Sequence, residues 1–163
     1  MRLDGSCHCG AVRFSVEAYA PVPYMRCYCS ICRKTAGSGG FAINLGAHAH
    51  TLTVTAAEGA IGVYRALIDG EQSPMERRFC TRCGTALWAW DPRWPSLLHP
   101  HAGAIDTPLP APPEAAHILI GSKAEWVRVD AAAGEQCFDA YPDQSLADWH
   151  RARGLLEGPA PEA

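Results

Sequence analysis

The sequence predicts a mainly β protein of one domain, built around bound metal and containing few short helices. Three observations predict it: short segments in which apolar and polar residues alternate, seven cysteines in three tight groups, and sparse helix signals. A chain of 163 residues fits one domain and can bury a core without disulfides. We expect this domain to span residues 1–156 and a disordered tail to follow over residues 157–163.

Alternation locates the strands of the first half. Val12, Phe14 and Val16 share one face of a strand predicted over residues 11–17. Further strands are predicted over residues 41–45, 52–55 and 62–68. Two more segments, 75–79 and 86–90, lead into and out of the last cysteine group, which predicts a hairpin with a zinc knuckle at its tip.

Helices are expected in only two places. Residues 30–35 predict one short turn after Cys29. The stronger signal covers residues 145–156, where Ser145 can cap the N-terminus and Gly154 weakens the end. Between them we expect an extended, proline-rich connector over 106–113 and strands over 117–120 and 126–129.

Composition excludes several function classes. A formal net charge of −3 argues against a general nucleic-acid binder, which would carry a basic excess. The sequence contains no stretch of 18 apolar residues, so we expect no membrane span. The first residues contain no apolar signal region. We therefore expect a cytoplasmic, reducing location, where dense cysteines are typical of metal sites rather than disulfides.

The first and last cysteine groups read C-H-C-G and C-T-R-C-G. Cys7 and Cys9 present two sulfurs on one face of an extended segment, and Cys80 and Cys83 converge in a tighter turn. Each group ends in glycine, which can adopt φ > 0 and bring backbone N–H groups near the sulfurs. One zinc ion held by all four would close a long loop and stabilise the fold. The alternatives are buried cysteines or a redox C-x-x-C at Cys80.

The middle group, C-Y-C-S-I-C, has three cysteines, at Cys27, Cys29 and Cys32. Three thiolates leave one position of a zinc tetrahedron open, as catalytic zinc sites do. Such a centre is a good receptor for another thiol, which coordination would deprotonate. Cys137 leaves two alternatives open: it completes a second closed site, or it is a lone thiol.

Charged residues and histidines near these groups have weaker interpretations. Positive side chains flank the middle group, at Arg26, Arg33 and Lys34. They neutralise the metal–thiolate cluster, capture a carboxylate of the ligand, or do both. Two histidine pairs have metal-compatible spacing, but each lies in a loop-like context, and we expect positions outside the metal shell for His48, His50, His99 and His101.

Four segments together resemble a known family. They are G-S-C-H-C-G-A-V-R-F, C-Y-C-S-I-C-R-K-T-A-G-S, F-C-T-R-C-G-T-A-L-W and A-H-I-L-I-G-S-K-A-E-W, and they extend from about Gly5 to Trp126. In this order they resemble the glutathione-dependent formaldehyde-activating enzyme family, which includes a centromere-associated branch. The resemblance implies an Mss4-like, zinc-bound β fold.

The resemblance also implies two zinc ions, one structural and one catalytic. The structural ion would be held by Cys7, Cys9, Cys80 and Cys83, and the catalytic one by Cys27, Cys29 and Cys32. The implied activity is S-(hydroxymethyl)glutathione synthesis, a carbon–sulfur lyase reaction in the reverse sense, with glutathione and a small aldehyde as partners. For the assembly state we expect a monomer or a homodimer. Tyr28 departs from the pattern, because many members have histidine there; as a proton donor, tyrosine would be weaker near neutral pH.

A second function class remains open at this point. A non-catalytic, zinc-stabilised thiol-binding or interaction module could use the same fold, since fold does not fix function. Such a structural module needs only the closed four-cysteine site. The three middle cysteines therefore favour an enzyme that acts on a thiol.

Overall fold

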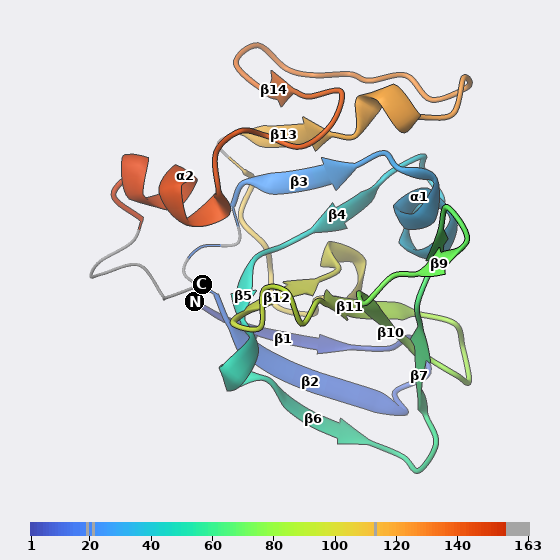
Figure 1. The fold of residues 1–163 in the computed structure, drawn as a ribbon. Helices are drawn as coiled ribbons and strands as arrows, with labels where there is room; N and C mark the ends of the chain where they lie inside the picture. Colours follow the sequence, from blue (N-terminus) through green and yellow to red (C-terminus); the bar gives the residue numbers. More distant parts are fainter. Residues whose placement is uncertain (19, 21, 113, 156–163) are drawn as a thin grey trace.

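The computed structural model describes residues 1–18, 20, 22–112 and 114–155, and it is mainly β. Its strands form sheets of three, five and four strands and one two-stranded hairpin. Figure 1 shows the three larger sheets as layers, which we call the lower, middle and upper sheets. The expected disordered tail over 157–163 lies outside the described residues.

The lower sheet contains the clearest strand of the sequence. Its order is β1 (Arg2–Ser6), β2 (Val12–Glu17) and β6 (Thr53–Ala56), all antiparallel. The three apolar side chains of β2 are buried and the residues between them are more exposed, which confirms the alternation. The turn between β1 and β2 contains the first cysteine pair.

The middle sheet is fully antiparallel and contains the predicted hairpin. Its order is β5 (Ala47–His48), β12 (Leu97–Pro100), β11 (Ala86–Trp90), β10 (Glu76–Cys80) and β7 (Ile61–Tyr64). Strands β10 and β11 pair directly and place the last cysteine pair at their tip. This confirms the hairpin that the flanking apolar segments predict.

The strand predicted over 62–68 is divided in the structure. Strand β7 ends at Tyr64, and β8 (Leu67–Ile68) pairs instead with β9 (Glu71–Gln72). Asp69 and Gly70 connect β8 and β9 with φ angles of 52° and 85°. Positive φ at both residues is what a two-residue hairpin turn requires, so the local turn ends the longer run.

The upper sheet joins segments that are distant in sequence. Its order is β14 (Gln136–Cys137), β13 (Ala115–Ile118), β3 (Tyr24–Cys27) and β4 (Ala42–Asn44). Strand β13 runs parallel to both β3 and β14, whereas β4 is antiparallel to β3. The strand predicted over 126–129 is wrong: these residues pair with no strand, and Trp126 is 64% exposed.

Two short α-helices complete the upper layer. Helix α1 (Ser30–Ala36) follows β3, and α2 (Leu146–Ala152) lies near the end of the described chain. Ser145 caps α2 through a hydrogen bond from the Asp148 backbone, as predicted. The helices lie near opposite ends of β3 (Figure 1). No helix in the described ranges has the length and apolar character needed to cross a membrane.

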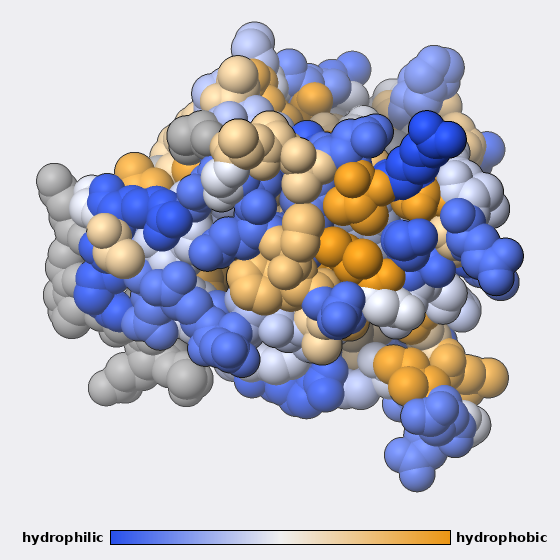
Figure 2. All heavy atoms as spheres, turned by 90° about the horizontal axis from the view of Figure 1, so that it is seen from above, coloured by the Kyte–Doolittle hydropathy of each residue, from blue (hydrophilic) through white to orange (hydrophobic). Residues whose placement is uncertain are grey.

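The main core fills the space between the lower and middle sheets. Phe14 of β2 packs edge-to-face on Trp88 of β11, with ring centroids 5.0 Å apart. A smaller apolar cluster joins the middle group of cysteines to Ala42, Ala116 and Ile118 of the upper sheet. Figure 2 shows the molecule from above relative to Figure 1, and on this face apolar residues form patches separated by hydrophilic ones.

Candidate metal centres

The first candidate centre lies where the lower sheet meets the middle sheet. The sulfurs of Cys7, Cys9, Cys80 and Cys83 all lie within 4.8 Å of one another. The Sγ atoms of Cys7 and Cys9 are 3.5 Å apart, and those of Cys9 and Cys80 are 3.7 Å apart. A tetrahedral zinc ion with ligands at about 2.3 Å separates its sulfurs by about 3.8 Å. These four residues therefore fit one zinc ion.

The backbone around this centre has turns and N–H groups that favour the thiolate form of its cysteines. Gly10 and Gly84 both have φ of 75°, so each cysteine pair ends in the same left-handed turn. The backbone N–H of Val12 donates to Cys7 Sγ over 3.2 Å. That contact is one of the influences that leave the pKa of Cys7 below its usual value, although burial acts in the opposite direction. Two turns that lie far apart in the sequence thus have the same backbone geometry, and each contributes two cysteines to this centre.

The second candidate centre lies at the junction of β3 and α1. Cys27 ends β3, Cys29 caps α1, and Cys32 lies in its first turn. The Cys29 sulfur accepts a hydrogen bond from the Cys32 backbone N–H over 3.3 Å. All three sulfurs lie within 4.8 Å of one another, and Cys27 Sγ is 3.6 Å from Cys29 Sγ. This separation also fits two ligands of one tetrahedral zinc ion.

The three thiols share charge unevenly. The hydrogen bond from Cys27 lowers the pKa of Cys29 to about 2, with further contributions from Cys32 and backbone N–H groups. The pKa of Cys27 is raised, first by its hydrogen bond to Cys29 and then by Cys32 and burial. When three thiols pack this closely, one of them, Cys29, ionises readily, and its negative charge opposes ionisation of the others. This is the donor set that a divalent metal ion neutralises.

No fourth ligand joins this group within the described ranges. Cys137 is exposed and lies opposite His117 in the pairing of β13 with β14. Its neighbour Gln136 lines the same cavity as Cys27, so alternation places Cys137 on the other face of the upper sheet. Of the two alternatives for Cys137, the structure favours the lone thiol.

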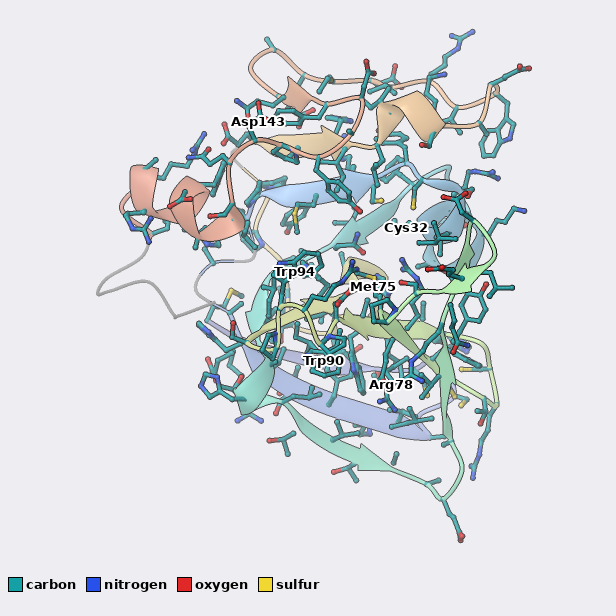
Figure 3. All side chains as sticks on the ribbon, in the orientation of Figure 1. Cys32, Met75, Arg78, Trp90, Trp94 and Asp143 are labelled. Atoms are coloured by element: carbon teal, nitrogen blue, oxygen red, sulfur yellow. The ribbon has the colours of Figure 1, made fainter. Side chains whose placement is uncertain are left out.

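The trithiolate group opens into a cavity of about 690 Å³ between the middle and upper sheets. Strand β3 contributes alternate residues to its wall, namely Pro23 just before the strand, Met25 and Cys27. The intervening side chains therefore face away from the cavity. Figure 3 shows Met75 and Trp94 between the two sheets and Cys32 on α1 at one end.

Tyr28 faces away from the cavity and is fully buried. Its O–H donates to His117 Nδ1 over 2.8 Å, and His117 Nε2 donates to Glu135 Oε2 over 3.0 Å. The hydrogen bond from His117 is the main reason why the pKa of Glu135 is lowered. Because its proton is used in this chain, Tyr28 is not placed to donate to a ligand in the cavity. The structure thus corrects the view of Tyr28 as a proton donor.

The three basic residues predicted to hold a ligand do not line the cavity. Arg26 lies on the Tyr28 side of β3, 3.9 Å from the Glu135 carboxylate and 5.6 Å from the Phe41 ring centroid. Arg33 and Lys34 lie on α1, where Arg33 is half-buried and Lys34 is exposed. Arg26 was expected at the ligand because it is next to Cys27 in the sequence. Side chains alternate along β3, however, so Arg26 lies on the face opposite the cavity.

Arg77 is the basic residue that reaches the group, and sequence spacing did not identify it. Its guanidinium donates to Cys32 Sγ over 3.6 Å and to Met75 Sδ over 3.4 Å. Arg77 lies 45 residues from Cys32 and reaches it only because the middle sheet packs under α1. The one available signal was the alternation of Met75 and Arg77 just before the last cysteine pair.

One histidine of the two predicted pairs lies in the cavity wall. His99 Nδ1 donates to the Leu45 carbonyl over 3.0 Å, so the lone pair of neutral His99 is on Nε2. Burial lowers the pKa of His99 and keeps it neutral near pH 7. Arg77, Ala89 and His99 are register partners across β10, β11 and β12 and form one row under the cavity.

The other histidines take no part in a metal group of the described chain. His48 and His50 lie with their rings 5.6 Å apart. His101 is buried, and burial lowers its pKa to about 3. Sequence analysis also missed Tyr141, which lines the cavity although 69% of its surface is exposed. Its pKa is raised, first by the partial burial of its hydroxyl and then by the nearby cysteine group.

Comparison with known proteins agrees with this geometry. Residues 2–122 match the sequence model of a family described as glutathione-dependent formaldehyde-activating enzyme. A curated protein of Halomonas elongata, which carries the same description provisionally, is 56% identical over 158 residues. That alignment covers 97% of this chain and all of the relative.

A solved structure supports the fold. The crystal structure of a Rhodobacter sphaeroides protein, a structural-genomics target, is similar with a TM-score of 0.51 and 26% sequence identity. The similarity covers 68% of this chain and 92% of that one. The arrangement of sheets described above therefore has a solved counterpart over most of its length.

Proposed function

Because the chain belongs to the glutathione-dependent formaldehyde-activating enzyme family, we propose that it joins the thiol of glutathione to formaldehyde at the trithiolate group. The reaction makes S-(hydroxymethyl)glutathione, and its reverse is a carbon–sulfur lyase reaction. One observation carries the proposal: three convergent sulfurs, with no fourth ligand in the described chain, open into a cavity large enough for a small molecule.

Two zinc ions are part of the proposal. The four-cysteine group would hold the structural ion, and Cys27, Cys29 and Cys32 would hold the catalytic one. A zinc ion held by these three thiolates would leave room for a further ligand and would lower the pKa of a thiol bound there. Arg77 offsets the excess negative charge of this thiolate group through its contact with Cys32.

The remaining steps fall to side chains of the cavity wall. His99 Nε2 carries a lone pair and lines the same cavity, and we assign it the role of accepting the thiol proton. The sulfur then forms a bond to the carbonyl carbon, and the π electrons of the C=O bond move to its oxygen. Tyr141 can donate a hydrogen bond to that oxygen, and the proton held by His99 completes the hydroxyl group.

Metal content measured together with thiol binding tests the proposal. We expect two zinc ions per chain in the purified protein, with glutathione altering the spectrum of a cobalt-substituted trithiolate site and leaving the four-cysteine site unchanged. A single metal ion per chain would contradict the open site. Glutathione binding without faster exchange between formaldehyde and its glutathione adduct, followed by NMR, would favour the non-catalytic thiol-binding module.

A further inference from the structure

The cavity is much larger than the chemistry of formaldehyde requires. Formaldehyde has two non-hydrogen atoms and fills about the space of one or two water molecules, each about 30 Å³. The cavity measures about 690 Å³, within the range of drug-sized ligand pockets. A thiol substrate occupies part of this space, and its sulfur must reach the trithiolate end. The side chains that form the wall of the rest of the cavity indicate what else can bind there.

That wall is apolar along one direction. Pro23 and Met25 extend from Cys27 along β3, and Ala116 and Ile118 of β13 lie beside them. At about 3.3 Å per residue, Pro23 lies about 13 Å from Cys27. Beyond Pro23 the wall continues to α2, through the residues Leu146 and Trp149. We call this path from Cys27 to Trp149 the apolar trough.

The charged groups of the cavity are already paired or lie at its edge. Arg77 contacts Cys32, and Arg93 makes two hydrogen bonds from its guanidinium to the Asp91 carboxylate, at 2.9 and 2.7 Å. Asp143 is exposed and lies away from Cys32, near the segment that leads into α2 (Figure 3). Within the described wall, the apolar trough thus offers no unpaired cation to an anionic ligand.

We propose that the preferred carbonyl substrate, beyond formaldehyde itself, is an aldehyde with an apolar alkyl or aryl body, which lies in the apolar trough while its carbonyl carbon meets the thiol at the trithiolate group. This inference rests on the proposed function and changes only the aldehyde. The bonds are those of the formaldehyde reaction: S–H adds across C=O, a C–S bond forms, and the thiol proton ends on oxygen. The polar ends of the thiol substrate remain at the open mouth.

Stable thioethers of glutathione measure the trough directly. S-methylglutathione and S-hexylglutathione imitate adducts with a short and a long body, and calorimetry on the zinc-loaded protein compares their affinities. Burial of each methylene should strengthen binding roughly fourfold, so the hexyl compound, with its longer chain, should bind several hundredfold tighter. Equal affinities would overturn the inference, and NMR exchange rates with hexanal no greater than with formaldehyde would do the same.

Variants separate the trough from the metal chemistry. Leu146→Gln should reduce the preference for the hexyl compound and leave S-methylglutathione binding unchanged, and Met25→Gln provides a second site if α2 is perturbed. Leu155→Gln is the matched control, because Leu155 lies outside the cavity wall. A full chain-length preference that persists in both Leu146→Gln and Met25→Gln overturns this inference. Failure of glutathione to alter the trithiolate metal overturns the proposed function instead.

Discussion

Replacing Tyr28 by phenylalanine tests the buried chain that runs from Tyr28 through His117 to Glu135. The change removes one hydroxyl and leaves His117 Nδ1 without a donor at a site with no solvent exposure. An unsatisfied buried polar group costs about 1–3 kcal/mol, so we expect unfolding free energy to fall by about 2 kcal/mol. For a chain of this length, each kcal/mol shifts Tm by about 2–4 °C, which gives a fall of about 4–8 °C.

Thermal unfolding of the zinc-loaded protein, followed by circular dichroism, measures this change. Tyr64→Phe is the matched control, because Tyr64 is exposed and its change should stay within about 0.5 kcal/mol. Tyr28 also lies between Cys27 and Cys29, so a chelator should remove the trithiolate metal about tenfold more easily from the variant. Equal stability of the two variants would refute the structural role, and unchanged metal affinity would refute the link to the thiolates.

The remaining predictions concern the metal sites, the base and pH. Cys80→Ser should unfold the domain, whereas Cys32→Ser should lose one zinc ion and keep the circular dichroism spectrum; equal damage would contradict separate roles. His99→Gln should slow glutathione–formaldehyde exchange about 10²–10⁴-fold with thiol binding retained, and an unchanged rate would remove His99 as the base. The pKa of Glu135 is lowered in the fold, so its contribution is present above pH 4.5 and disappears as pH falls below it. The stability difference between wild type and Glu135→Gln, from urea unfolding, should therefore shrink from pH 7 to pH 4.

The metal groups could be predicted from the sequence because their information is local. Cys7 and Cys9 are two residues apart, and the glycines that follow each pair fix the turns at Gly10 and Gly84. The open group followed from the same reasoning, since Cys27, Cys29 and Cys32 need only one strand end and one helix turn to converge. Short spacing determines short distances.

The cavity could not be predicted in the same way, because its wall depends on which sheets face each other. Arg77 and His99 reach it from the middle sheet, through register partners that no spacing in the sequence reveals. The strand predicted over 126–129 failed for a related reason. Its pattern is compatible with a strand, but no neighbouring strand pairs with it, and backbone pairing is a property of the whole sheet.

Strand β3 has a consequence for which mutations the protein tolerates. Met25 and Cys27 line the cavity, whereas Arg26 lies on the side of Glu135, and Tyr28, just after the strand, donates a hydrogen bond to His117. A substitution changes one of these faces, but the insertion or deletion of a single residue would exchange them. Arg26 would then enter the cavity, and Cys27 would leave its two sulfur partners. We expect relatives to keep Cys27 and the length of this segment constant, even where its other side chains vary.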